Sequence, residues 1–151
     1  MADGWQQSGR QRYRLEGDII LSRWSGACTE QELEPFLAFA EKVLARLTHP
    51  FLLIDNTYAL PGLPAVRRRV VTWARTHTFA GGVAIFGSDW ATRAIGMLML
   101  NAIALLKRTD LNKRIIYVRE ENEARAWVDQ RRVLLRTMMQ AASTASEPPA
   151  P

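Results

Sequence analysis

The chain has 151 residues, which is a suitable length for one domain with its own hydrophobic core. Its apolar fraction of 48% and charged fraction of 23% are ordinary for a globular protein. The formal net charge is +5, but the basic residues are spread along the chain, so nucleic-acid binding is not expected. The single cysteine, Cys28, excludes an intrachain disulfide and suits a reducing compartment, and we predict a cytoplasmic location.

The chain opens with MADGWQQSGR, which is polar and lacks the apolar run of a signal peptide, so residues 1–10 are predicted to be a flexible leader. The pattern changes at Tyr13. The stretches YRLEGD and IILSRWSG predict two short strands around the Glu16-Gly17-Asp18 turn, because apolar residues alternate on either side of it. The domain therefore begins with a β-hairpin.

The first helix is predicted over residues 29–48. Thr29 and Glu32 have the spacing of a capping box, in which each side chain bonds to the backbone N–H of the other residue. Apolar residues then recur at helical spacing, and Pro35 lies near the first turn, where proline is tolerated. The predicted inner face consists of Leu33, Phe36, Leu37, Ala40, Leu44 and Leu47.

The apolar run PFLLID predicts a central strand buried on both faces. A loop over residues 56–62 follows, and Pro64 opens a helix over residues 64–76. GGVAIFG is a second buried strand, after which Ser88 or Asp89 caps a helix that ends near Arg108.

The stretch NKRIIYVRE predicts the last strand, and Asn122 is the expected cap of the last helix. One side of this helix is apolar and comprises Ala124, Trp127, Val128, Leu134, Leu135 and Met138. The segment 141–151 is small, polar and rich in proline, and is predicted to be a disordered tail.

Strands that alternate with helices predict an α/β fold with right-handed crossovers. We expect a mixed, mostly parallel sheet of about five strands with four helices, formed by residues 11–140. The order of several local signatures resembles the SpoIIAA-like branch of the STAS superfamily, whose bacterial members are also described as STAS/SEC14-like. The stretches that carry this resemblance are EGDIILSRWSGACTEQEL, FLLIDNTYALPGLPAVRR, GGVAIFGSDWATRAIGMLML and EENEARAWV.

The resemblance implies a compact domain that acts as a protein-interaction or regulatory module and sometimes binds a small ligand or lipid. Antagonist-type STAS proteins are phosphorylated on a serine near the helix that follows the central strand. The usual Asp-Ser-Ser-Gly pattern is missing here, and Thr57 is the candidate hydroxyl at the corresponding place. The other interpretation is that Asp55 and Asn56 only satisfy backbone groups of a turn.

No catalytic constellation is apparent in the sequence. Cys28 lies beside a helix start, where a thiol pKa can be lowered, but no assigned base accompanies it. His49 and His77 do not have ligand-like spacing, so no metal site is predicted, and GGVAIFG lacks the features of a phosphate-binding loop. We therefore predict a protein that is not an enzyme and needs no cofactor.

The stretch AIGMLMLNAIALL, residues 94–106, is apolar almost all round and is interrupted only by Asn101. It is too short to span a bilayer, so the chain is not predicted to be transmembrane. A second copy of the chain, the last helix, another protein or a lipid must cover its second face. Met97 and Met99 suit an adaptable surface, and Gly96 permits close approach. The predicted interaction surface is Ile95, Met97, Leu98, Met99, Asn101, Ala102 and Leu105.

Arg67, Arg68 and Arg69 form a solvated helix face or contact an anion or an acidic partner. The sequence thus predicts a regulatory or scaffolding domain that acts through protein–protein contact as a homodimer, with an unidentified protein as a further partner. The alternative is a binding module for a lipid or another apolar small ligand beside residues 94–106.

Overall fold

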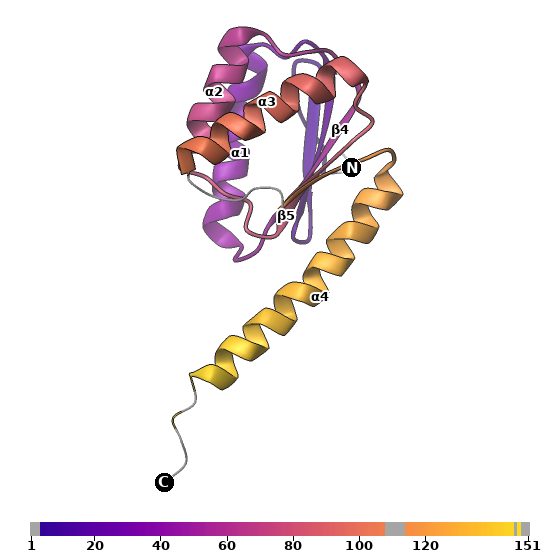
Figure 1. Ribbon diagram of the computed structural model, residues 1–151. Helices are drawn as coiled ribbons and strands as arrows, with labels where there is room; N and C mark the ends of the chain where they lie inside the picture. The colour runs from indigo at the N-terminus through magenta and orange to yellow at the C-terminus, as the bar shows by residue number, and fades with distance from the viewer. Residues whose placement is uncertain (1–3, 108–113, 147, 149–151) are drawn as a thin grey trace.

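A computed structural model describes residues 4–107, 114–146 and 148, with the elements arranged as in Figure 1. The strands are β1 (Gln6–Ser8), β2 (Gln11–Glu16), β3 (Ile19–Gly26), β4 (Phe51–Ala59), β5 (Gly82–Phe86) and β6 (Ile115–Val118). The helices are α1 (Glu30–Arg46), α2 (Pro64–Ala74), α3 (Trp90–Lys107) and α4 (Glu121–Ala145).

The sheet has six strands in the order of the chain, β1-β2-β3-β4-β5-β6. The first three pair antiparallel, and β3 to β6 pair parallel. The predicted α/β class, four helices, opening hairpin and mostly parallel mixed sheet are confirmed.

The sixth strand comes from the segment that was predicted to be flexible. Gln6–Ser8 pair with β2, and the preceding Trp5 packs against the sheet. Three arginines hold the Trp5 ring, with their guanidinium carbons 4.5 to 5.1 Å from the ring centroid: Arg12, Arg14 and Arg23. Each cation–π contact stabilises by about 0.5–1 kcal/mol at an exposed site, so this segment has a reason to be ordered.

The order of the strands decides where the helices lie. Each crossover from β3 to β6 moves one strand in the same direction, and right-handed crossovers then place α1, α2 and α3 on one face of the sheet. Helix α4 lies on the other face and extends beyond the sheet (Figure 1). The sheet therefore separates two hydrophobic cores.

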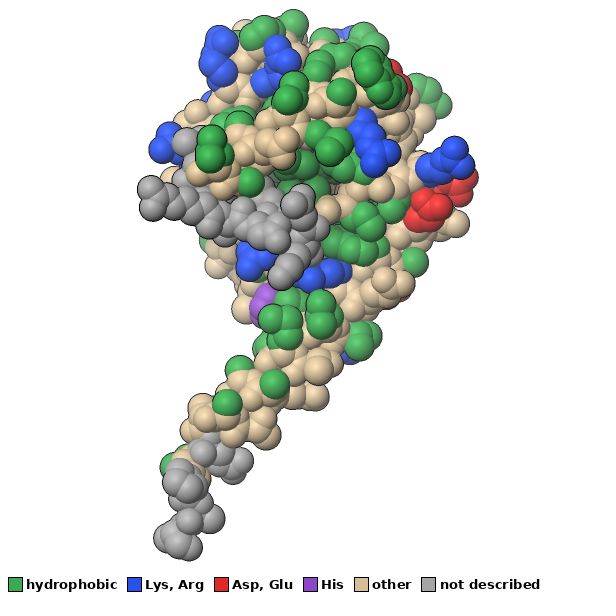
Figure 2. All heavy atoms as spheres, in the orientation of Figure 1, with side chains coloured by type: hydrophobic (Ala, Val, Ile, Leu, Met, Phe, Trp, Pro, Cys, Tyr) green, Lys and Arg blue, Asp and Glu red, His purple; other side chains and the backbone are tan. Residues whose placement is uncertain are grey.

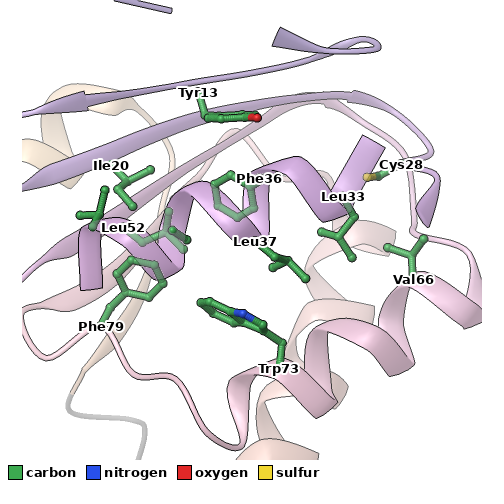
Figure 3. Close-up of a cluster of buried hydrophobic side chains, with 12 residues drawn as sticks. Tyr13, Ile20, Cys28, Leu33, Phe36, Leu37, Leu52, Val66, Trp73 and Phe79 are labelled. Carbon is green, nitrogen blue, oxygen red and sulfur yellow. The ribbon is translucent and has the colours of Figure 1, made fainter. Parts of the chain in front are cut away.

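The first core lies between the sheet, α1 and α2. Side chains alternate along each strand, so Ile20 and Leu52 point into this core while their neighbours Leu21 and Leu53 point to the opposite face. Trp73 reaches from α2 toward α1 (Figure 3). Its indole N–H donates to Glu41 Oε1 at 2.8 Å. The buried members drawn there include Tyr13, Leu33, Phe36, Leu37, Val66 and Phe79.

The second core is formed by α4 and the opposite face of the sheet, with Ala124 and Val128 fully buried. The predicted cap at Asn122 is wrong. The N-cap is Glu120, and the Glu123 carboxylate accepts from the backbone N–H groups of Arg119 at 2.9 Å and Glu120 at 3.4 Å. The helix also continues to Ala145, so the first residues of the predicted tail are helical.

Two other helix caps agree with the predictions. Thr29 Oγ1 accepts from the backbone N–H of Glu32 at 3.2 Å, and Asp89 Oδ1 accepts from that of Thr92 at 2.8 Å. The sequence also predicted that the Glu32 carboxylate accepts from the backbone N–H of Thr29. This carboxylate accepts instead from Gln11 Nε2 at 2.5 Å. The predicted end of the third helix near Arg108 falls outside the described residues.

The loop predicted over residues 56–62 is shorter than expected. Strand β4 continues to Ala59, because β3 is long enough to pair with it beyond a bulge at Arg23 and Ser25. Asp55, Asn56 and Thr57 are therefore strand residues at the carboxyl end of β4.

Candidate functional site: an apolar pocket beneath helix α3

A pocket of about 240 Å³ lies between the carboxyl halves of the parallel strands, α2 and α3. Its floor includes Ile54, Ile85 and Tyr117, which are paired in register across β4, β5 and β6. Its walls come from α2 and α3 and include Val66, Val70, Ile95, Met99 and Ile103. Hydrophobic side chains follow α3 and line the visible part of the hollow beside it (Figure 2). Pockets at the carboxyl ends of parallel strands are the usual ligand sites of α/β sheets.

The close packing of α3 over the pocket floor depends on Gly96. A Cβ atom at this position would lie 2.5 Å from Tyr117 Oη. The sequence placed Gly96 at a contact surface for another molecule, whereas here it permits close approach to a strand residue of the same chain. Tyr117 Oη is buried without a hydrogen-bond partner among the described residues, and burial raises the pKa of this phenol.

The structure divides the predicted interaction surface in two. Ile95 and Met99 turn inward and line the pocket. The other five residues are exposed on the outer side of α3: Met97, Leu98, Asn101, Ala102 and Leu105. The exposed fractions of Leu98 and Leu105 are 68% and 80%. Helix α3 is therefore not sealed within the subunit.

The arginine run is divided as well. Arg69 is held by Glu34, to which it donates at 2.6 and 3.1 Å. Arg67 and Arg68 instead line a groove between α2 and α3, and Arg67 also lines the pocket. Among the residues that the structure describes, neither forms an ion pair.

Thr57 is exposed at the end of β4, seven residues before α2 begins. Its hydroxyl donates to Asp55 Oδ1 at 2.6 Å, and the backbone N–H of Thr57 donates to the same oxygen at 3.0 Å. Asp55 therefore satisfies local backbone and side-chain groups, as the turn interpretation predicted, although it does so from a strand. Asn56 donates to Ser88 Oγ at 3.1 Å and so ties β4 to the start of α3.

Cys28 is not activated by the helix start. The thiol is buried and donates to the Thr29 carbonyl oxygen at 3.3 Å, and burial together with Glu32 raises its pKa to about 12. His77 stacks on Trp73 with ring centroids 4.3 Å apart, and its Nε2 lies 3.6 Å from Glu41 Oε1. Cys28 lines the pocket beneath α3, but His77 is not among its lining residues, so the described part of the structure does not pair this thiol with a histidine there.

Within the described ranges, no group of three or more His, Cys, Asp or Glu side chains is arranged to hold a metal ion. None of the helices described there has both the length and the hydropathy needed to span a bilayer. No protein-family model matches the sequence, and no curated protein matches it.

The alternative predicted from the sequence placed an apolar ligand beside residues 94–106, but it did not identify the strand residues that form the floor of the pocket. Ile54 and Ile85 were treated only as buried strand residues. The signal was Tyr117, the one polar side chain within the strand IIYV. Which strand residues share one face with Tyr117 became visible only from the register of the sheet.

Proposed function

We propose that the protein is a non-enzymatic, cytoplasmic, STAS-like interaction domain that binds a second copy of itself through the outer side of α3. The supporting observation is the exposed apolar surface of Met97, Leu98, Ala102 and Leu105. The α/β fold agrees with the STAS-like description, and no nucleophile with a base converges among the described side chains. Surfaces of this kind are uncommon on isolated monomers and mark contact sites.

A second copy fits this surface better than a charged partner does. Ala94, Leu98, Asn101 and Leu105 follow one another at spacings of four, three and four residues, which is the seam of a helix pair. The described part of this seam carries no charge, so an acidic or basic partner has no complement there. Asn101 lies in the middle, and its amide donates and accepts, so it can pair with the same amide across a two-fold axis.

Cover by the last helix, one of the alternatives predicted from the sequence, does not occur. Helix α4 packs on the opposite face of the sheet through Ala124 and Val128. The outer side of α3 is therefore left for another molecule.

The test is light scattering of the wild-type chain and Leu98→Glu over a range of concentrations. We expect a wild-type dimer and a folded Leu98→Glu monomer, because pairing would bury two like charges against apolar groups. Met139→Glu is the matched control, since Met139 is 54% exposed on α4, and it should remain a dimer. A wild-type monomer at high concentration would refute the proposal, and a Leu98→Glu dimer would place the interface elsewhere.

A further inference from the structure

Among the residues that the structure describes, the pocket beneath α3 has an apolar interior and one charged side chain in its lining. That side chain is Arg67, which is half-buried on α2. Its stem packs at Gly62, and no acidic group pairs with it among the residues that the structure describes. An apolar pocket with one convergent cation is complementary to an amphiphile whose head is an anion.

The pocket continues into the groove between α2 and α3. Arg67, Ile95 and Met99 line both, and the groove adds Arg68. The side chains of two arginines thus line the region where the pocket meets the groove. Guanidinium groups bind carboxylates through two parallel hydrogen bonds, which an ammonium or an amide does not reproduce.

We propose that this pocket binds a medium-chain fatty acid, with its alkyl tail beneath α3 and its carboxylate at Arg67 and Arg68. The volume sets the length of the tail. An apolar cavity of about 150 Å³ holds benzene with its six carbons, so the pocket of about 240 Å³ holds about ten carbons at the same density. A long-chain fatty acid or a two-chain lipid exceeds this volume.

The experiment measures binding of decanoate and decanol to the full chain by isothermal titration calorimetry. Arg67→Gln should reduce the preference for decanoate over decanol by about tenfold, because only the carboxylate uses the guanidinium. Arg75→Gln is the matched control: it removes the same charge from an exposed position at the end of α2, outside the pocket lining. It should change neither affinity by more than about twofold.

A second variant tests the location of the tail. Val70→Phe places a larger apolar side chain in the pocket lining, so it should abolish binding of both ligands while the fold is kept. Far-UV circular dichroism and the melting temperature establish that this variant is folded. Hexadecanoate should bind more weakly than decanoate.

Absence of decanoate binding would overturn the proposal, and so would binding that survives in folded Val70→Phe. An unchanged preference in Arg67→Gln would overturn the assignment of the carboxylate. The alkyl tail lies on the inner side of α3, while the groove at Arg67 and Arg68 is also lined by Leu98 and Ala102 of the dimer surface. Calorimetry reports decanoate binding and light scattering of the same samples reports the dimer, so failure of one proposal is distinguished from failure of the other.

Discussion

The contact between Gly96 and Tyr117 makes a quantitative prediction about how α3 is seated on the sheet. In Gly96→Ala, the new methyl group meets Tyr117 Oη at 2.5 Å, and such overpacking costs about 2 kcal/mol. Alanine also favours the helix over glycine by about 1 kcal/mol. We therefore expect Gly96→Ala to lower the free energy of unfolding by about 1 kcal/mol.

Removal of the Tyr117 hydroxyl should turn the effect of Gly96→Ala from destabilising to stabilising. Tyr117→Phe removes a buried hydroxyl that has no hydrogen-bond partner in the described part of the chain, which should raise the free energy of unfolding by about 1 kcal/mol. In the Tyr117→Phe background, the nearest ring atom would lie 3.6 Å from the methyl group that Gly96→Ala introduces, which is an ordinary contact. The double variant should then be about 2 kcal/mol more stable than the wild type, so the coupling between the two sites is about 2 kcal/mol.

The assay is urea denaturation of the four proteins, monitored by far-UV circular dichroism. The dependence of the free energy of unfolding on urea concentration should be the same for all four, so that differences in midpoint report differences in stability. A coupling near zero would refute the reasoning, since it would mean that the Tyr117 hydroxyl does not contact α3. Destabilisation by Gly96→Ala that persists unchanged in the Phe background would refute it as well. Either result would also remove the geometry on which the pocket depends.

Three further predictions follow from the other sites. The Cys28 thiol, whose pKa is raised to about 12, should resist alkylation at mildly alkaline pH and react only upon unfolding, so fast labelling of the native protein would contradict its burial. Burial raises the pKa of Glu16, but hydrogen bonds from Arg125 and Arg14 outweigh it, so the pKa lies below its ordinary 4.5. The stabilisation from Glu16 is then present above pH 4.5 and is lost as the pH falls through the lowered pKa. Arg125→Gln should therefore lower the free energy of unfolding by about 1 kcal/mol at neutral pH and by less in acid. Equal losses at both pH values would contradict this. If Thr57 is phosphorylated, its peptide should carry the added mass when isolated from the host, and an unmodified peptide in every growth state would argue against it.

Local patterns predicted most elements because each depends on neighbours in the chain. The capping residues Thr29 and Asp89 bond within one helical turn, so spacing identified Thr29 and narrowed the other cap to Ser88 or Asp89. The prediction at Asn122 was wrong because Glu123 reaches back to Arg119 and Glu120, and competing caps within three residues cannot be ranked from spacing. Gln6–Ser8 form a strand because they pair with β2 and because arginines from two strands contact the preceding Trp5. A local sequence pattern does not contain these contacts.

The sequence by itself determined the α/β class, the alternation of strands and helices, and the presence of more apolar surface on α3 than one sheet can bury. Only the tertiary structure decided which side of α3 meets the pocket and which side meets solvent. It also brought Ile54, Ile85 and Tyr117 into one row and set Arg67 beside them. The physical reason is that periodicity fixes the face on which a side chain lies, while strand register and crossover hand fix what that face opposes.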